Sequence, residues 1–330
     1  MKLNELDLEY QKRILNWIPK RIFDIHNHIG LSSHHKPLSD ERKVSCMAAS
    51  EAYNQSRYIL EKKFKSLLPG IKVDYVVFPF PFRETHIKKA NNYALSCTNP
   101  FILGDLEKPK ETLDLLKKSS VRGLKIYYDS LKRDYSKIRI LDFLPEIFLD
   151  ELNKSQKPIM LHVPGSSVND NENVNELNYV LNKFPKVKII LAHMGRCSTK
   201  EELIGASIKL KNLENIFWET STISSSEVFE EAIKIFGIEK ILYGSDSPYA
   251  FTKGRIMDVP GEIKNPFITE KRFPWTKPYL RRWYLKNKPP LTFLLYHQLD
   301  AMRNAFENLE INTEDLEKVF YGNAINLLKN

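Results

Sequence analysis

The sequence of 330 residues has few of the features that mark secreted, membrane-spanning or dinucleotide-binding proteins. Its three cysteines, Cys46, Cys97 and Cys197, lie far apart without paired spacing, so we expect no disulfide framework and a reducing, cytoplasmic compartment. No run approaches the roughly 18 consecutive apolar residues of a membrane helix. The first twenty residues are charged throughout and lack the apolar segment of a secretory signal. A glycine-rich dinucleotide fingerprint is also absent.

Acidic residues are also fewer than basic ones. Lys and Arg number 50 against 41 Asp and Glu, which gives a formal charge of +9. Most lysines stand beside Asp or Glu in helix-like stretches, as is typical of a solvated surface. The exception is residues 272–290, where basic and aromatic residues interleave, and two roles fit this segment: covering a pocket or binding an anionic partner. A hydrophobic content of 42% indicates a globular protein with a substantial core.

One pattern recurs along the chain: a short apolar, β-branched run, a turn, and then a charged amphipathic stretch. Several runs are apolar almost throughout, which is typical of strands buried on both faces of a parallel sheet. The eight predicted strands are 21–26, 73–80, 101–106, 121–128, 158–163, 188–193, 215–221 and 240–246. Helix-like patterns between them include 111–119, 144–156, 173–185 and 225–237, the last with Ser226 as N-cap and Gly237 as stop.

Eight strands alternating with helices predict a single α/β domain over residues 1–330, a (β/α)₈ TIM barrel. A doubly wound open sheet is the alternative, because alternation alone does not establish closure. Long connections follow the first and eighth strands, at 31–70 and 247–290. Both are expected at the carboxyl ends of the strands, where this fold builds active sites, and 247–290 is expected to cover that face. The other predicted elements are an N-terminal helix within 1–20, a helix-like stretch at 40–68, and two closing helices at 292–309 and 313–328.

Five side chains that can bind metals fall at the ends of predicted strands. In "DIHNHIG", residues 24–30, period-two alternation directs His26 and His28 to one side, with Asp24 in line behind them. The fifth, sixth and eighth strands end in His162, His193 and Asp246. Each residue alone is more often a hydrogen-bonded core or turn residue. In a closed barrel, however, these strand ends form one ring, so the five together predict a metal site.

The motifs "DIHNHIG", "LHVPG", "LAHMG" and "YGSDSPY" resemble those of the amidohydrolase superfamily. The similarity is greatest to the amidohydrolase-related branch that includes aminocarboxymuconate-semialdehyde decarboxylase. It runs in order from residue 22 to about 250, and "VFYGNAINLL" resembles the end of that branch. The resemblance implies a (β/α)₈ barrel with one divalent ion, usually zinc. Its implied ligands are His26, His28, His162 and Asp246, with His193 nearby as an acid/base or charge-stabilising group.

These residue types suit that chemistry. Neutral imidazoles and a carboxylate bind Zn²⁺ while leaving a position for water or substrate. The ion lowers the pKa of a bound water from about 15.7 towards 7. Asp246 can hold the ion through one oxygen and accept the proton of the water with the other. His193 can then polarise a carbonyl group or protonate the leaving group.

Two cations are candidates for binding an anionic substrate. Lys125 lies on the fourth predicted strand and is expected to face inward. In binuclear members of the superfamily a carboxylated lysine from that strand bridges two metals, so two ions are the alternative to the one favoured here. Arg83 follows the second strand and could bind a carboxylate, with an exposed arginine as the alternative. Arg196 and Glu219 also lie near strand ends and have no role assigned.

The leading hypothesis is a metal-dependent hydrolase that acts on an amide, lactone or ester of a small, anionic molecule. A non-oxidative decarboxylase using the same metal site is the alternative, because both reactions need a Lewis acid beside a proton donor. A TatD-like deoxyribonuclease is less favoured, since that family places a glutamate ligand on its fourth strand, where this chain has Lys125. We therefore expect a small-molecule substrate, with neither membrane nor nucleic acid as a partner. A homodimer is the usual assembly of barrels in this branch.

Overall fold

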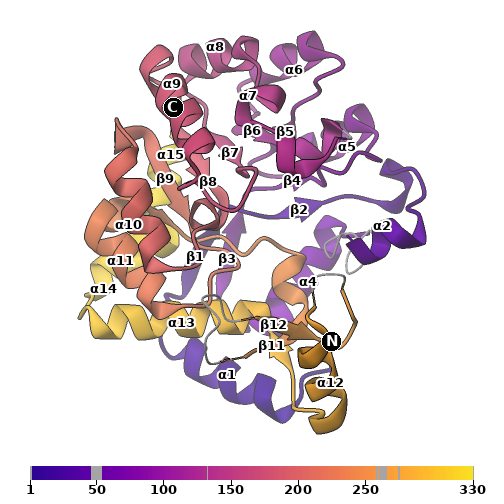
Figure 1. Cartoon of the computed structure of the whole chain (residues 1–330), viewed down its shortest axis with the longest axis vertical. Helices are drawn as coiled ribbons and strands as arrows, with labels where there is room; N and C mark the ends of the chain where they lie inside the picture. The colour runs from indigo at the N-terminus through magenta and orange to yellow at the C-terminus, as the bar shows by residue number, and fades with distance from the viewer. Residues whose placement is uncertain are drawn as a thin grey trace.

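A ring of parallel strands lies at the centre of the molecule with helices around it (Figure 1). The computed structural model describes residues 2–45, 54–131, 133–257, 259, 266–273 and 276–329. The ring strands are β1 (Arg21–Asp24), β2 (His28–Ile29), β3 (Lys72–Tyr75), β4 (Phe78–Pro79), β5 (Phe101–Leu103), β6 (Gly123–Ile126), β7 (Ile159–Leu161), β8 (Ile189–Leu191), β9 (Ile216–Glu219) and β10 (Ile241–Leu242). The helices are α1 (Glu5–Leu15), α2 (Asp40–Ser45), α4 (Arg57–Leu67), α5 (Ile87–Leu95), α6 (Pro109–Leu116), α7 (Ile140–Phe143), α8 (Glu146–Ser155), α9 (Asn171–Lys183), α10 (Lys200–Lys209), α11 (Ser226–Phe236), α12 (Pro278–Asn287), α13 (Leu294–Asn308), α14 (Thr313–Glu317) and α15 (Asn323–Leu328). No helix in the described part of the chain combines the length and the apolar character that crossing a membrane requires.

The ring closes through hydrogen bonds between its first and last strands. β1 pairs with β3, and β2 with β4, in parallel register. A parallel bridge between Val77 and Pro100 joins this half to the six-stranded sheet that runs from β5 to β10. The backbone N–H of Ile25 donates to the carbonyl of Tyr243 at 3.1 Å and so links β1 to β10. The predicted (β/α)₈ barrel is confirmed, and the open sheet is excluded.

Alternate residues of each strand point into the barrel or out to the helices. In β7 the middle residue, Met160, belongs to the inner cluster together with Ile190 of β8. Its neighbours Ile159 and Leu161 belong to the larger cluster that packs between the strands and the helices. This arrangement is the reason that the strands read as continuous apolar runs. Because the interior is filled by side chains, the strand ends are the place for a site.

The alternation predicted for "DIHNHIG" places His26 and His28 on one side, and both line one cavity, but the position predicted for Asp24, the last residue of β1, is wrong. Phe23 and Ile25 both belong to the inner cluster, so Asp24 does not lie in line behind the histidines. Instead, Asp24 Oδ1 accepts hydrogen bonds from the backbone N–H groups of His26 and Ser245, each at 3.0 Å. The carboxylate therefore joins the loop after β1 to the loop after β10.

The two long connections contain short elements. The first carries α2 and α4, while residues 46–53 of the predicted helix-like stretch lie outside the described residues. The second carries a three-stranded antiparallel sheet of β11 (Lys253–Ile256), β12 (Phe267–Thr269) and β13 (Thr292–Phe293). The sequence did not predict this sheet, because strands of four residues or fewer show little alternation. The predicted closing helix at 292–309 accordingly begins at Leu294, and the second is divided into α14, a π-helical turn and α15.

The ends of α11 test the helix signals read from the sequence. The predicted N-cap, Ser226, is the first helical residue, and the N-cap is Ser225, whose side chain makes no capping hydrogen bond. Gly237 ends the helix as predicted. Its φ of 80° lies in the left-handed region that favours glycine.

Candidate metal centre

A cavity of about 110 Å³ lies at the carboxyl ends of the barrel strands. Its walls are formed by His26, His28, Phe80, Pro81, Phe82, Lys125, Tyr127, His162, His193 and Asp246. The five predicted strand-end residues and Lys125 therefore meet in one place, whereas Arg83 is not among the described residues that line it. No described residue of 247–290 lines the cavity either, so a cover formed by that segment stays a prediction.

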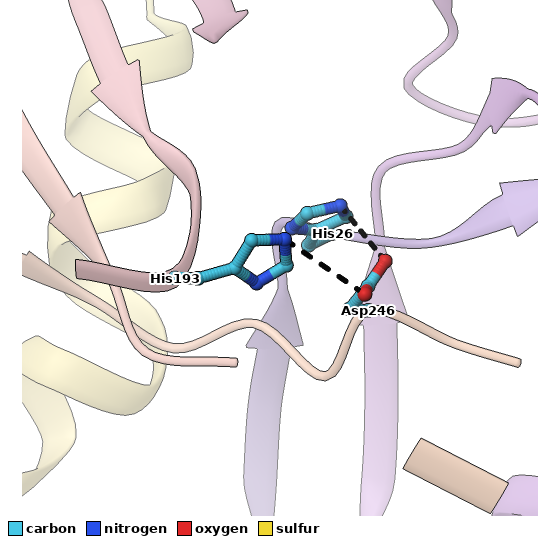
Figure 2. Close-up of side chains that lie close together, drawn as sticks. All are labelled: His26, His193 and Asp246. Carbon is cyan, nitrogen blue, oxygen red and sulfur yellow. Dashed lines mark ion pairs between the residues drawn. The ribbon is translucent and has the colours of Figure 1, made fainter. Parts of the chain in front are cut away.

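Asp246 approaches two histidines with a single carboxylate oxygen. Its Oδ1 lies 3.1 Å from Nε2 of His26 and 3.1 Å from Nε2 of His28. Its Oδ2 lies 3.9 Å from Nε2 of His193, and Figure 2 shows the rings of His26 and His193 directed at this carboxylate. Asp246 has a φ of 57°, a left-handed conformation that costs a non-glycine residue about 1 kcal/mol or more. The surrounding contacts thus hold this carboxylate in place against local backbone strain.

Glu219, the last residue of β9, orients His26 from the side away from the cavity. Its Oε2 accepts a hydrogen bond from Nδ1 of His26 at 2.9 Å, and the carboxylate is fully buried. With the proton on Nδ1, His26 presents Nε2 to Asp246. A Cβ atom at position 244 would collide with Glu219 Oε1, so Gly244 leaves the space that this carboxylate occupies. Burial works against a charged His26, but Asp246 and Glu219 together raise its pKa to about 9.

The same glutamate also positions His193. Glu219 Oε2 accepts hydrogen bonds from the backbone N–H of His193 at 3.0 Å and from the hydroxyl of Ser221 at 2.8 Å. Because Ser221 has given its only hydroxyl proton to Glu219, its Oγ accepts from Nδ1–H of His193 at 2.8 Å. Burial lowers the pKa of His193 to about 4, despite the nearby carboxylates of Asp246 and Glu219. His193 is therefore a neutral imidazole whose Nε2 faces Asp246 without a proton.

His162 and Lys125 complete the polar part of the cavity. The ring of His162 lies edge-on to those of His193 and Tyr127, with centroids 5.0 Å apart in both cases. Lys125 is 2% exposed, and its Nζ lies 5.1 Å from the centre of the Phe78 ring. Burial lowers the pKa of Lys125 to about 8, although Asp246 and Glu219 act in the opposite direction. A cation with so little solvation favours an anionic ligand beside it.

Arg83 lies just beyond the cavity wall, where Asp129 holds it. Its guanidinium donates to Asp129 Oδ1 at 2.8 Å, and its backbone N–H donates to Oδ2 at 2.9 Å. Asp129 also accepts from Arg42 at 2.6 Å and from the hydroxyl of Tyr135. This arrangement joins the first long connection to the loops after β4 and β6. A role of Arg83 in binding substrate stays a prediction.

The donor atoms of the cavity fit a divalent cation. His26, His193 and Asp246 each offer one ligand atom, and these atoms lie within 4.8 Å of one another. Nε2 of His26 is buried and faces Asp246 Oδ1 at 3.1 Å, with no other partner among the described residues, as suits a nitrogen that shares a metal ion with that carboxylate. Its Nδ1 donates to a carboxylate, the arrangement that commonly orients zinc-bound histidines. His28 and His162, the other histidines of the predicted ligand set, line the same cavity.

Comparison with known families finds that residues 105–329 match the profile of the family described as Amidohydrolase. The match covers more than half of the chain. The chain belongs to the amidohydrolase family. It is therefore an enzyme, and the resemblance to the amidohydrolase superfamily is confirmed, with three of the four motifs inside the matched residues. A comparison with curated proteins finds no match to this amidohydrolase.

Solved structures share the fold of this amidohydrolase at low sequence identity. An amidohydrolase from Burkholderia multivorans with bound zinc has a TM-score of 0.57 at 9% identity, over 93% of this chain and 98% of its own. 5-Carboxyvanillate decarboxylase from Sphingomonas paucimobilis has a TM-score of 0.55 at 13% identity, over 94% and 99%. A dihydroxybenzoic acid decarboxylase from Polaromonas sp. JS666, with bound manganese and the inhibitor 2-nitroresorcinol, has a TM-score of 0.53 at 16% identity, over 93% and 96%.

The sequence did not predict the roles of Glu219 and Ser221 in this amidohydrolase. Glu219 ends a predicted strand but has no metal-binding motif around it, and Ser221 follows two residues later, on the same side by strand periodicity. That spacing is the one signal that could have paired them. The sequence has no signal for the place of Phe80 and Phe82 in the cavity wall, because apolar side chains at a strand end are typical of a core.

Proposed function

We propose that this amidohydrolase is a metal-dependent hydrolase that cleaves an amide, lactone or ester bond in a small, anionic molecule. The observation that carries this proposal is that one cavity is lined by His26, His28, His162, Asp246 and Lys125. The three histidines and the aspartate would hold one divalent ion, zinc. When bound, zinc supplies a Lewis acid that makes water a nucleophile at neutral pH.

Proton transfer falls to Asp246 and His193 in this proposal. Asp246 directs Oδ1 at His26 and His28, which leaves Oδ2 as the acceptor for the proton of the attacking water. Nε2 of His193 lies 3.9 Å from Oδ2 and carries no proton of its own, so it can take up that proton and deliver it to the leaving group. The hydrogen bond from Nδ1 to Ser221 holds the ring in the orientation that this transfer needs.

Lys125 is the proposed binding group for the anionic part of the substrate. It is buried in the cavity wall, and it forms no salt bridge in the described part of the chain. A carboxylate of the substrate would replace the solvation that Lys125 loses on burial. Removal of this cation is therefore expected to weaken binding of charged substrates more than of neutral ones.

Decarboxylation of a small aromatic carboxylic acid is the second candidate. It is favoured by the aromatic side chains of Phe80, Phe82 and Tyr127 in the cavity walls, which can flank a planar ring. Two of the proteins with the same fold are named as decarboxylases of aromatic acids. The same residues would bind the ion. Lys125 or His193 would lie near the carboxylate group of the substrate or near the ring carbon that carries it.

A direct comparison of substrates tests these proposals. The zinc-loaded protein is incubated with a panel of lactones and esters, with dihydroxybenzoates, and with single-stranded DNA; Asp246→Asn is the control for contaminating activity. Turnover of a lactone or ester that is lost in Asp246→Asn supports hydrolysis. Release of CO₂ from a dihydroxybenzoate, without lactone cleavage, would replace hydrolysis by decarboxylation, and cleavage of DNA alone would overturn both.

A further inference from the structure

The positive charge of the chain is concentrated in one short segment outside the metal centre. Seven Lys and Arg residues and no Asp or Glu lie within residues 271–290, so this basic segment carries +7 of the formal net charge of +9. It also holds two of the four Trp residues of the chain. None of its described residues lines the cavity at the strand ends. The proposed reaction therefore does not account for it.

The helix α12 within this segment has an inner and an outer face. Leu280 is 3% exposed, and the guanidinium of Arg281 donates to the carbonyl of Glu270 at 2.7 Å, so this side attaches the helix to the loop after β12. Tyr284, four residues after Leu280, lies on the same side and stacks under Arg281. Among the residues that the structure describes, Leu280 and Arg281 thus attach this inner face of α12 to the rest of the molecule.

On the outer face, helical spacing places Arg282 and Lys286 at the centre and the exposed apolar side chains of Trp283 and Leu285 on the two flanks. Arg282 and Lys286 lie one turn apart, are exposed, and form no salt bridge with any residue that the structure describes. Trp283 is 37% exposed and Leu285 is 53% exposed. Large apolar side chains gathered among cations on one surface helix are typical of an interaction site. Figure 1 places α12 at the edge of the molecule, where a large surface can approach it.

We propose that the outer face of α12 binds the surface of an anionic lipid bilayer. The Lys and Arg side chains would lie at the lipid phosphates, while Trp283 and Leu285 enter the boundary between headgroups and acyl chains. A helix of ten residues is about 15 Å long, so it would lie in the interface and not cross the bilayer. This proposal departs from the expectation that the chain has no membrane partner, and it concerns peripheral binding alone.

Charge and shape favour a bilayer over two other occupants. A second copy of this chain on a two-fold axis would bring the cations of both helices together, which is unfavourable. Nucleic acid would satisfy the charges, and its bases could stack on Trp283. It offers no apolar phase for Leu285, however, which is the most exposed of the large apolar side chains of α12.

Sedimentation with lipid vesicles tests the proposal. The zinc-loaded protein is mixed with vesicles of phosphatidylcholine alone or of phosphatidylcholine with phosphatidylglycerol, at low and at high salt. We expect binding to the anionic vesicles only, weakened by salt, with a blue shift of Trp emission that is reduced in Trp283→Phe. Arg282→Gln/Lys286→Gln should lower the partition coefficient at least about tenfold, since each cation contributes about fivefold. The matched control is Lys117→Gln/Lys118→Gln, the same charge change beside α6 at the opposite end of Figure 1.

The outcomes separate the lipid surface from its rivals. Loss of vesicle binding in the α12 variant, with binding and melting temperature kept in the control variant, supports the proposal. Equal loss of vesicle binding in both variants would show that binding depends on the overall charge of the chain, and this would overturn the proposal. Binding to single-stranded RNA or DNA without binding to anionic vesicles would overturn it in favour of nucleic acid. Dimer formation that is abolished by Trp283→Ala, again without vesicle binding, would overturn it in favour of self-association.

Discussion

Oε2 of Glu219 lies 2.9 Å from Nδ1 of His26 and 3.0 Å from the backbone N of His193. One buried carboxylate oxygen thus positions a proposed metal ligand directly and the proposed proton carrier through its backbone and Ser221. The two functions of the site, binding the ion and moving the proton, depend on the same side chain. The two functions can be tested separately at Ser221, because this residue contacts His193 and does not contact His26.

That geometry predicts different results for two substitutions. Glu219→Gln removes the charge behind His26 and is expected to lower zinc affinity by about 10- to 100-fold. Ser221→Ala leaves the contact of His26 intact, so zinc affinity should stay within a few-fold while kcat falls by about 10-fold or more with KM unchanged. Competition with a chelator and steady-state kinetics measure the two effects. Loss of zinc in Ser221→Ala, or wild-type affinity in Glu219→Gln, would contradict the separation.

Metal content measured by elemental analysis tests the predicted ligands. After loading and desalting we expect about one equivalent of zinc per chain, largely lost in His26→Ala and Asp246→Ala but retained in His193→Ala. His193 is the informative residue, because its Nε2 lies close enough to Asp246 to serve as a ligand itself. Zinc loss in His193→Ala combined with retention in His162→Ala would exchange the roles of these two histidines. Two equivalents of zinc per chain in the wild type would favour the alternative of a binuclear site.

Zinc binding should also depend on pH. In the metal-free protein the pKa of His26 is raised to about 9, so at pH 7 the ring carries a proton that an incoming ion must displace. Apparent affinity is therefore expected to rise between pH 7 and 9, by up to about tenfold per unit, and to level off above pH 9. His28 releases no proton in this range, since burial lowers its pKa to about 4. Calorimetry in buffers of different ionisation enthalpy counts the protons, and release of none at pH 7 would contradict the prediction.

The sequence predicted the barrel and the cavity residues because both depend on local patterns. Buried parallel strands read as apolar runs, and a histidine or aspartate that ends such a run stands out. What the sequence did not predict depends on distance through space. The contact between Glu219 and His26 joins strands 193 positions apart, and the one between Arg83 and Asp129 joins two loops. Asp24 departs from the predicted alternation, and its carboxylate accepts a hydrogen bond from the backbone of Ser245, a contact that no local pattern records.

Lys125→Met should stabilise the metal-free protein while impairing its function. Burial lowers the pKa of Lys125 to about 8 from an ordinary value near 10.5, so below pH 8 the folded state carries a poorly solvated charge. The unfolded state binds more protons between pH 8 and about 10.5, so the stability of the wild type rises with pH in that window. Methionine removes the charge, and we expect a gain of about 1–3 kcal/mol at pH 7 that narrows above pH 8.

A second buried lysine supplies the control for this variant. Nζ of Lys157 donates to the carbonyls of Leu116 at 2.5 Å and Lys118 at 2.7 Å, so Lys157→Met removes two hydrogen bonds and should destabilise the protein by about 1–3 kcal/mol. Thermal unfolding at pH 7 and pH 9 compares the two variants. In the kinetic test, Lys125→Met should raise KM at least about tenfold for a carboxylate substrate and little for its methyl ester, because a buried cation in the cavity contributes only where it meets an anion. Equal effects on KM for the acid and for the ester would contradict a role of Lys125 in substrate binding. Its destabilising effect on the folded protein would then be its only consequence.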